Sequence, residues 1–129
     1  MSLTPPRLER FLTSSAHAPS EAREAVRTEV GADLEPRLAA DLMVIVSELV
    51  TNGVLHGRAS ARRRIGLRVW SADRIVRVEV ENAGGFSIDE RAHGSVGGLG
   101  LGLVAKMSHR WGLESGPTDT TIVWAELAR

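Results

Sequence analysis

The chain has 129 residues, 43% hydrophobic and 25% charged, which is the size and composition of one domain with an ordinary core. Sixteen basic residues balance sixteen acidic ones, so the strong positive field that attracts nucleic acids is excluded. With no cysteine, the chain can form neither disulfides nor thiolate metal sites. We see no secretory segment and no apolar run expected to span a bilayer, so a cytoplasmic domain without membrane contact is expected.

One strand and two helices are predicted in the first part of the chain. Residues 8–12 alternate in the manner of an edge strand. Ser20 is a candidate N-cap and Gly31 a candidate stop, which predicts a surface helix over residues 21–30. A second helix is predicted from about Asp33 to Leu55 with a proline in its first turn. Because apolar residues fill most of its circumference, we expect this helix to be central and buried on more than one side.

Two strands are predicted after the second helix. Apolar residues alternate with other residues over 65–69 and again over 76–80, with a turn at 71–73 between them. This pattern predicts an antiparallel hairpin with one face in water. Helical spacing resumes at Leu103, and a last strand is predicted over residues 120–127. The three tryptophans are expected at sheet edges and helix–sheet contacts, at Trp70, Trp111 and Trp124.

Glu48, Asn52 and His56 are spaced four residues apart, so they share one face of the second helix. This face overlaps the edge of the apolar stripe, which points polar groups toward the interior and requires partners for them. One economical partner is hydrated Mg²⁺, for which one amide oxygen from Asn52 plus phosphates would suffice. The alternative is structural: Glu48 pairs with an arginine, and His56 is a hydrogen-bonding residue at the helix end.

Glycines are concentrated between Asn82 and Gly102, where the last of them opens a helix. Backbone amides at such a helix start can bind phosphate without lysine, and Lys106 is the only lysine in the chain. A flexible connecting loop is the alternative. The P-loop pattern is absent, and the glycines do not follow a tight strand turn as in dinucleotide-binding folds. The motifs of eukaryotic-type kinases are also absent.

Taken in order, these segments resemble the GHKL superfamily of ATPases and kinases. Residues 48–57 (ELVTNGVLHG) resemble its N box, 82–84 (NAG) its G1 box, 98–104 (GLGLGLV) its G2 box, and 121–127 (TIVWAEL) its closing strand. The residues of the N box and the short length of the chain are most similar to those of the bacterial anti-sigma-factor serine/threonine kinases. We take residues 1–129 as a single histidine-kinase-like ATPase domain, with the motifs in about 34–127.

The resemblance implies a Bergerat fold, an α/β (α+β) two-layer sandwich with helices on one face of a mixed, mainly antiparallel sheet. It also implies ATP and Mg²⁺ as cofactors. Glu48 would be the general base and Asn52 the magnesium ligand. The remaining cofactor-binding residues would contact adenine or cradle the phosphates: Asn82, Gly84, Gly98, Gly100, Gly102 and Thr121.

The chain departs from the family pattern at three positions. Asn82 replaces the usual aspartate, which keeps an acceptor for the adenine amino group but removes the charge, at a cost of about tenfold in affinity. Gly53 stands where alanine is usual, with an expected cost to helix stability but not to chemistry. Thr120 stands where a glycine usually precedes the threonine.

Two functions follow from this comparison. The first is an ATP-dependent kinase of the anti-sigma type that phosphorylates a serine of an antagonist protein and sequesters a sigma factor, with a homodimer suggested by the resemblance. The second, favoured by Asn82, is a non-catalytic sequestering module with a degenerate nucleotide site. A detached histidine kinase domain is disfavoured, because no histidine lies in a dimerisation helix before the domain. Direct binding of nucleic acid is not expected.

Overall fold

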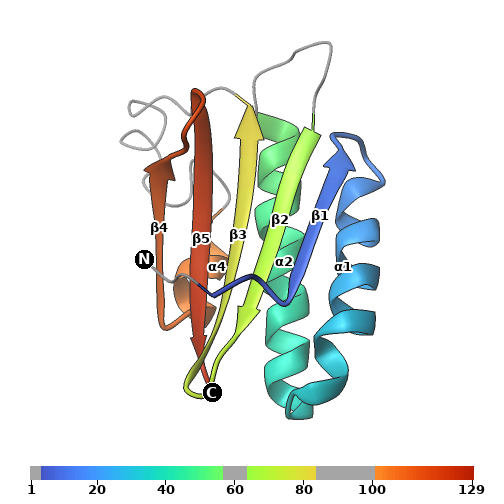
Figure 1. Ribbon diagram of the computed structural model, residues 1–129, viewed down its shortest axis with the longest axis vertical. Coiled ribbons are helices and arrows are strands. Elements are labelled where there is room, and N and C mark those ends of the chain that lie inside the picture. Colours follow the sequence, from blue (N-terminus) through green and yellow to red (C-terminus); the bar gives the residue numbers. More distant parts are fainter. Residues whose placement is uncertain (1–3, 57–63, 84–100) are drawn as a thin grey trace.

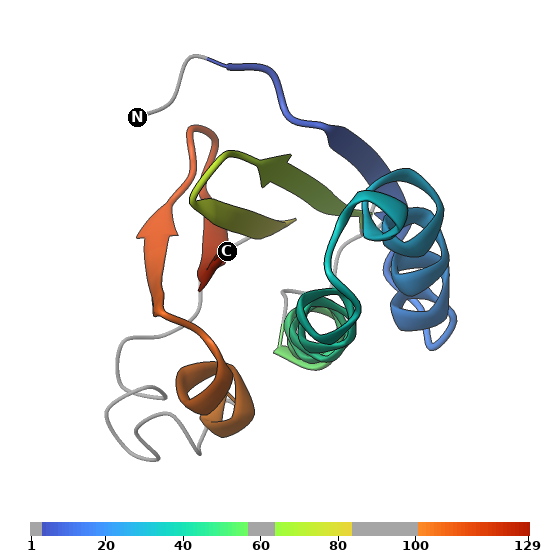
Figure 2. The same cartoon turned by 90° about the horizontal axis from the view of Figure 1, so that it is seen from below.

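The computed structural model describes residues 4–56, 64–83 and 101–129 and shows two layers. Five strands form one sheet, and the helices lie on one of its faces (Figures 1 and 2). The segment before the first strand crosses the opposite face of the sheet, which we call the open face (Figure 1). This arrangement is the expected α/β sandwich with helices on one side.

The strands follow the order β1-β2-β3-β5-β4 across the sheet, and all four neighbouring pairs are antiparallel. The resemblance implied a mixed, mainly antiparallel sheet, and every described pair of strands is antiparallel. Periodicity predicted the central strands well, because each presents alternate apolar residues to the helices. Their bounds are β1 Leu8–Thr13, β2 Arg64–Ser71, β3 Ile75–Ala83, β4 Arg110–Ser115 and β5 Thr120–Ala128.

Helix α1 spans Ala18–Glu29 and begins earlier than its sequence predicted. Its N-cap is His17, so the expectation that Ser20 caps the helix was wrong. The Ser20 hydroxyl instead donates to the His17 carbonyl oxygen at 3.0 Å, inside the first turn. Pro19 accounts for the difference, because a proline fits the first helical turn and does not have to precede the cap.

Helix α2 spans Pro36–His56, and its start was predicted three residues too early. A short 3₁₀ helix, η1 (Gly31–Asp33), precedes it. The Glu35 carboxylate accepts the backbone N–H groups of Arg37 at 2.7 Å and Leu38 at 3.2 Å. Proline at the first position and this side-chain acceptor together fix where the helix begins.

By length and composition alone, α2 could cross a membrane, because residues 36–55 have a mean hydropathy of 1.6. The expectation that no apolar run reaches that length was therefore wrong on this criterion. In the fold, α2 is the central helix and packs against α1, α4 and strands of the sheet, as its apolar circumference predicted. Several of its side chains are fully buried: Leu42, Ile45, Val46, Leu49 and Val50.

The last part of the chain holds a short helix and an unpredicted strand. Helix α4 spans Gly102–Met107. Strand β4 follows it and pairs only with β5, so it forms an edge of the sheet. Gly112 makes room in this strand for a tryptophan from β5, because a Cβ there would lie 2.9 Å from Trp124 Cζ2. The alternation of Trp111 and Leu113 with polar residues was the signal for this strand.

Candidate functional site

Two buried side-chain amides mark the helix face of the sheet. Asn52 on α2 is 3% exposed and Asn82 on β3 is 4% exposed. Neither amide oxygen nor amide nitrogen of either residue has a hydrogen-bond partner among the described residues. Buried polar groups are nearly always paired, and leaving one unpaired costs about 1–3 kcal/mol. These four polar atoms, which no described residue pairs, make this region the candidate functional site.

Gly53 allows the amide of Asn82 to approach α2. A methyl group at position 53 would overlap Asn82 Oδ1 and lie 3.2 Å from Cγ and 3.4 Å from Nδ2. The sequence predicts that glycine here costs helix stability but not chemistry. The structure adds a packing role, because the glycine leaves the space that the Asn82 side chain fills. The signal lay only in the joint departure of positions 53 and 82 from the family pattern.

Thr121 lies beside Asn82 on the same face of the sheet. The two residues are paired in the register of β3 and β5, and the Thr121 side chain is largely buried. The structure thus brings together Asn82 and Thr121, which are 39 positions apart in sequence. They form a polar end to a core face that is otherwise apolar along both strands.

Glu81 holds the same strands together on the open face, directly behind this polar pair. Its carboxylate accepts the Thr120 hydroxyl at 2.5 Å and Arg68 Nη2 at 2.5 Å, and so links β2, β3 and β5. Burial alone would raise the pKa of Glu81, but the bonds from Thr120 and Arg68 outweigh it and lower that pKa. Thr120, which departs from the family pattern, therefore supports the strand ends that carry Asn82 and Thr121.

Glu48 lies one turn before Asn52 on α2 and is partly exposed. Of the predicted glycine contacts, the structure describes only one. Gly102 is the first residue of α4 and is exposed, whereas Gly84, Gly98 and Gly100 lie outside the described residues. His56 is the last residue of α2.

The described residues fit a magnesium ion only if phosphates and water supply most of its ligands. Among the described residues, no three His, Cys, Asp or Glu side chains gather to hold a metal. A complete protein cage is thus not formed by this part of the chain. Asn52 Oδ1 is a neutral oxygen that no described residue pairs, which suits an ion that keeps several waters and takes its other ligands from phosphates. The donor set therefore fits Mg²⁺ bound together with a nucleotide.

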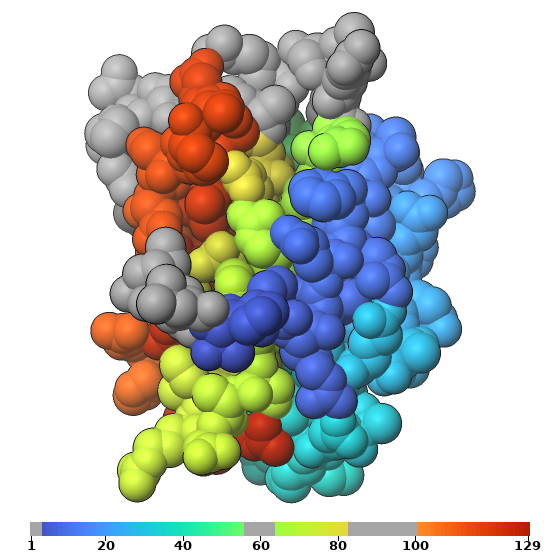
Figure 3. Space-filling model, viewed as in Figure 1, coloured from blue at the N-terminus to red at the C-terminus, as the bar shows by residue number. Residues whose placement is uncertain are grey.

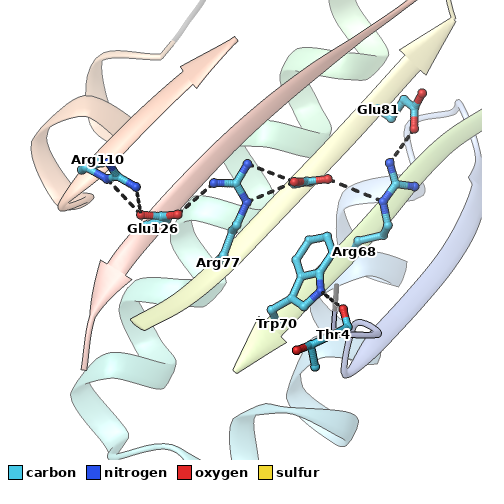
Figure 4. Close-up of polar contacts among 8 residues, drawn as sticks. Thr4, Arg68, Trp70, Arg77, Glu81, Arg110 and Glu126 are labelled. Atoms are coloured by element: carbon cyan, nitrogen blue, oxygen red, sulfur yellow. Dashed lines mark hydrogen bonds and ion pairs between the residues drawn. The ribbon is translucent and has the colours of Figure 1, made fainter. Parts of the chain in front are cut away.

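The open face carries a network of ion pairs that is separate from the amides (Figure 4). Glu126 accepts Arg77 Nη1 at 2.8 Å and Arg110 Nη2 at 2.8 Å, and Glu79 joins Arg77 to Arg68. Burial acts to raise the pKa of Glu126, but the bonds from Arg110 and Arg77 lower it below its usual value. Arg77 also lies over the ring of Trp124, 4.4 Å from its centroid. These charges neutralise one another, and their ion pairs link neighbouring strands of the sheet.

A groove of about 710 Å³ lies on this open face, lined in part by Thr4, Pro5 and Arg7 of the N-terminal segment. This segment crosses the sheet in the space-filling view (Figure 3). Trp70 and Trp124 line the groove, so these two tryptophans lie on the open face of inner strands and at neither the sheet edges nor the helix–sheet contacts expected for them. The indole N–H of Trp70 donates to the Thr4 carbonyl oxygen at 2.9 Å. Trp111 lies where expected, packed against the core. The groove is on the opposite side of the sheet from Asn52 and Asn82.

Comparisons with known proteins cover nearly the whole chain. Residues 12–125 match the family model described as the histidine kinase-like ATPase domain. The fold is similar to that in the crystal structure of the RsbU and RsbW domains of Rv1364c from Mycobacterium tuberculosis, with a TM-score of 0.70 and 21% identity over 98% of this chain. The chain spans 33% of that larger chain. No curated protein matches.

Proposed function

Because the chain belongs to the family of histidine kinase-like ATPase domains, we propose that it binds ATP with Mg²⁺ and acts as a regulatory serine/threonine kinase of the anti-sigma-factor type. The observation that supports the nucleotide site is the pair of buried amides, Asn52 and Asn82, whose four polar atoms have no partner among the described residues. ATP supplies what these atoms need, a base edge for one amide and a phosphate-bound cation for the other. We take the site to lie between α2 and the ends of β3 and β5.

Each residue has a distinct role in this proposal. Asn52 Oδ1 binds Mg²⁺, which neutralises charge on the phosphates. Asn82 meets the amino group of adenine, and Thr121 supports it from β5. Backbone amides at Gly84, Gly98, Gly100 and Gly102 are the expected contacts to the base and the phosphates, as the family resemblance implies.

Glu48 provides the base for the transfer step. It accepts the proton of an acceptor serine hydroxyl as that oxygen forms a bond to the γ-phosphorus and the bond to the ADP oxygen breaks. The acceptor belongs to an antagonist protein, and the sequestered partner is a sigma factor. A homodimer and a cytoplasmic location complete the proposal. The fold shared with the RsbW-containing chain is consistent with this role.

Thermal unfolding with and without Mg²⁺ and ATP tests the binding part. We expect millimolar ATP to raise the melting temperature of the native chain and of Glu48→Gln, but not of Asn52→Ala. Labelled phosphate from ATP should appear on serine when a cell extract is added to the native chain, and not with Glu48→Gln. If ATP raises the melting temperature but phosphate transfer to serine does not depend on Glu48, nucleotide binding stands and the proposed kinase activity is wrong.

The replacement of aspartate by Asn82 favours a second candidate, a sequestering module that has lost nucleotide binding. If the native chain shows no shift at millimolar ATP and Asn82→Asp acquires one, the kinase proposal fails and this candidate stands. If neither protein shows a shift, both the kinase and the ancestral nucleotide site are absent.

A further inference from the structure

The side chain of Asn82 is neutral, buried and free to present either end of its amide. No described residue bonds to Nδ2 or to Oδ1, so within the described part of the chain neither orientation of the amide is favoured over the other. The two ends have nearly the same shape, and a half-turn about the Cβ–Cγ bond exchanges them. The amide can therefore act as acceptor or as donor at the same point in space.

The space around this amide is set by Gly53. Because the glycine has no side chain, Asn82 fits against α2 with Cγ only 3.2 Å from where a Cβ would stand. The strand behind it is fixed by Glu81, whose carboxylate bonds to Thr120 and Arg68 on the neighbouring strands. The backbone of Asn82 is thus held in place, so the side chain can adapt to a bound base by rotating its amide.

We propose that this site accepts 6-amino and 6-oxo purine nucleotides with similar affinity, because the Asn82 amide can turn to match either base. The inference rests on the proposed function, in which Asn82 faces position 6 of the purine. For adenine, Oδ1 accepts from the 6-amino group while Nδ2 donates to N1. For hypoxanthine or guanine, the turned amide donates to O6 and accepts from the N1 proton.

A carboxylate at position 82 could not do this. It only accepts hydrogen bonds, so it suits a 6-amino group but would place its lone pairs against those of O6. Sites that hydrogen-bond a specific substrate group strongly reject the analogue that leaves polar atoms unpaired. Asparagine in place of aspartate therefore broadens the choice of base in addition to weakening the bond to adenine.

Calorimetric titration with ADP and IDP, each with Mg²⁺, tests the inference, since the two differ only at positions 6 and 1 of the ring. We expect the native chain to bind them with dissociation constants within about threefold of each other, because both make the same number of neutral bonds. Asn82→Asp should prefer ADP by about tenfold or more. Purine riboside diphosphate, which has hydrogen at position 6, should bind the native chain about fivefold more weakly than either.

The outcomes separate the inference from the function beneath it. If the native chain binds ADP and prefers it to IDP by tenfold or more, the inference is wrong and nucleotide binding stands. If Asn82→Asp folds, as judged by its circular dichroism, and keeps the native ratio, Asn82 does not read position 6 and the inference is also wrong. If Asn82→Asp does not fold, the purine riboside comparison on the native chain decides. Binding of none of the three nucleotides at millimolar concentration would overturn the proposed function itself.

Discussion

The amide of Asn82 fills the space where a side chain at position 53 would lie, so Gly53 on α2 and Asn82 on β3 are fitted to each other. Their fit connects helix α2, which carries Glu48 and Asn52, to the strand end that carries the other buried amide. It also explains two departures from the family pattern by one packing relationship.

We expect this fit to appear as coupling between two substitutions. In an Asn82→Ala background, Gly53→Ala should raise the free energy of unfolding by about 0.5–1 kcal/mol, because alanine is the better helix former. In the native background the same change should lower it by about 1 kcal/mol, because the new methyl group displaces a buried amide. Urea denaturation of the four proteins measures the coupling. An equal effect of Gly53→Ala in both backgrounds would contradict the fit.

Much of the fold could be predicted because it depends on local pattern. The apolar circumference of α2 and the alternation in β2 and β3 are readable along the chain, and each predicts burial that the structure confirms. The burial of Asn52 also followed from its place on the helix. What could not be predicted were pairings between distant segments, such as that of Asn82 with Gly53 or with Thr121.

Strand β4 was also not predicted, because it too depends on a contact with another strand. Gly112 interrupts its pattern, and local propensity disfavours glycine in a strand. The reason for glycine is the indole of Trp124 on β5, which is twelve positions further along the chain and beyond a turn. Likewise, Ser20 was the wrong cap for α1, and nothing in the local pattern singled out Glu35 as the acceptor at the start of α2.

The start of α2 depends on the Glu35 carboxylate, which accepts two backbone N–H groups. Glu35→Ala should lower the free energy of unfolding by about 1 kcal/mol, since this is the usual effect of removing a helix cap. Glu35→Asp is the matched control, because a shorter carboxylate is a favoured capping group. Chemical denaturation compares the three proteins. Equal stability of the alanine and aspartate variants would show that the carboxylate does not cap the helix.

Packing of Trp124 over Gly112 predicts a second glycine effect. Gly112→Ala should lower the free energy of unfolding by about 1–3 kcal/mol, because its Cβ would lie 2.9 Å from a ring atom of a partly buried indole. Gly66→Ala on the same open face is the control, since its nearest neighbour would be the end of the Arg68 side chain at 3.4 Å. Near-ultraviolet circular dichroism should report a moved indole in the first variant only. Equal tolerance of both changes would contradict this packing.

The ion pairs of Glu126 predict how stability depends on pH. Because the pKa of Glu126 is lowered in the fold from 4.5, its contribution is present above about pH 4.5 and is lost as the pH falls through the folded pKa. Glu126→Gln should therefore flatten the loss of stability below pH 4.5. At pH 7 it should lower the free energy of unfolding by about 1–2 kcal/mol, the scale of charged hydrogen bonds.

Glu24→Gln is the control for this measurement, because Glu24 makes only an exposed pair with Arg27 on α1. Its denaturation curves should follow the native protein across the acid range. If Glu126→Gln follows the native protein equally closely, Glu126 does not carry the acid sensitivity and the network contributes little.

Titration of Mg²⁺ and ATP into the native chain and into Asn52→Ala, followed by calorimetry, tests the central claim most directly. If the buried amides of α2 and β3 form a nucleotide site, the native chain should bind one equivalent of ATP, and Asn52→Ala should bind it at least about tenfold more weakly, because a charge-assisted contact is lost. No binding to the native chain at millimolar ATP, or equal affinity in the two folded proteins, would contradict the account.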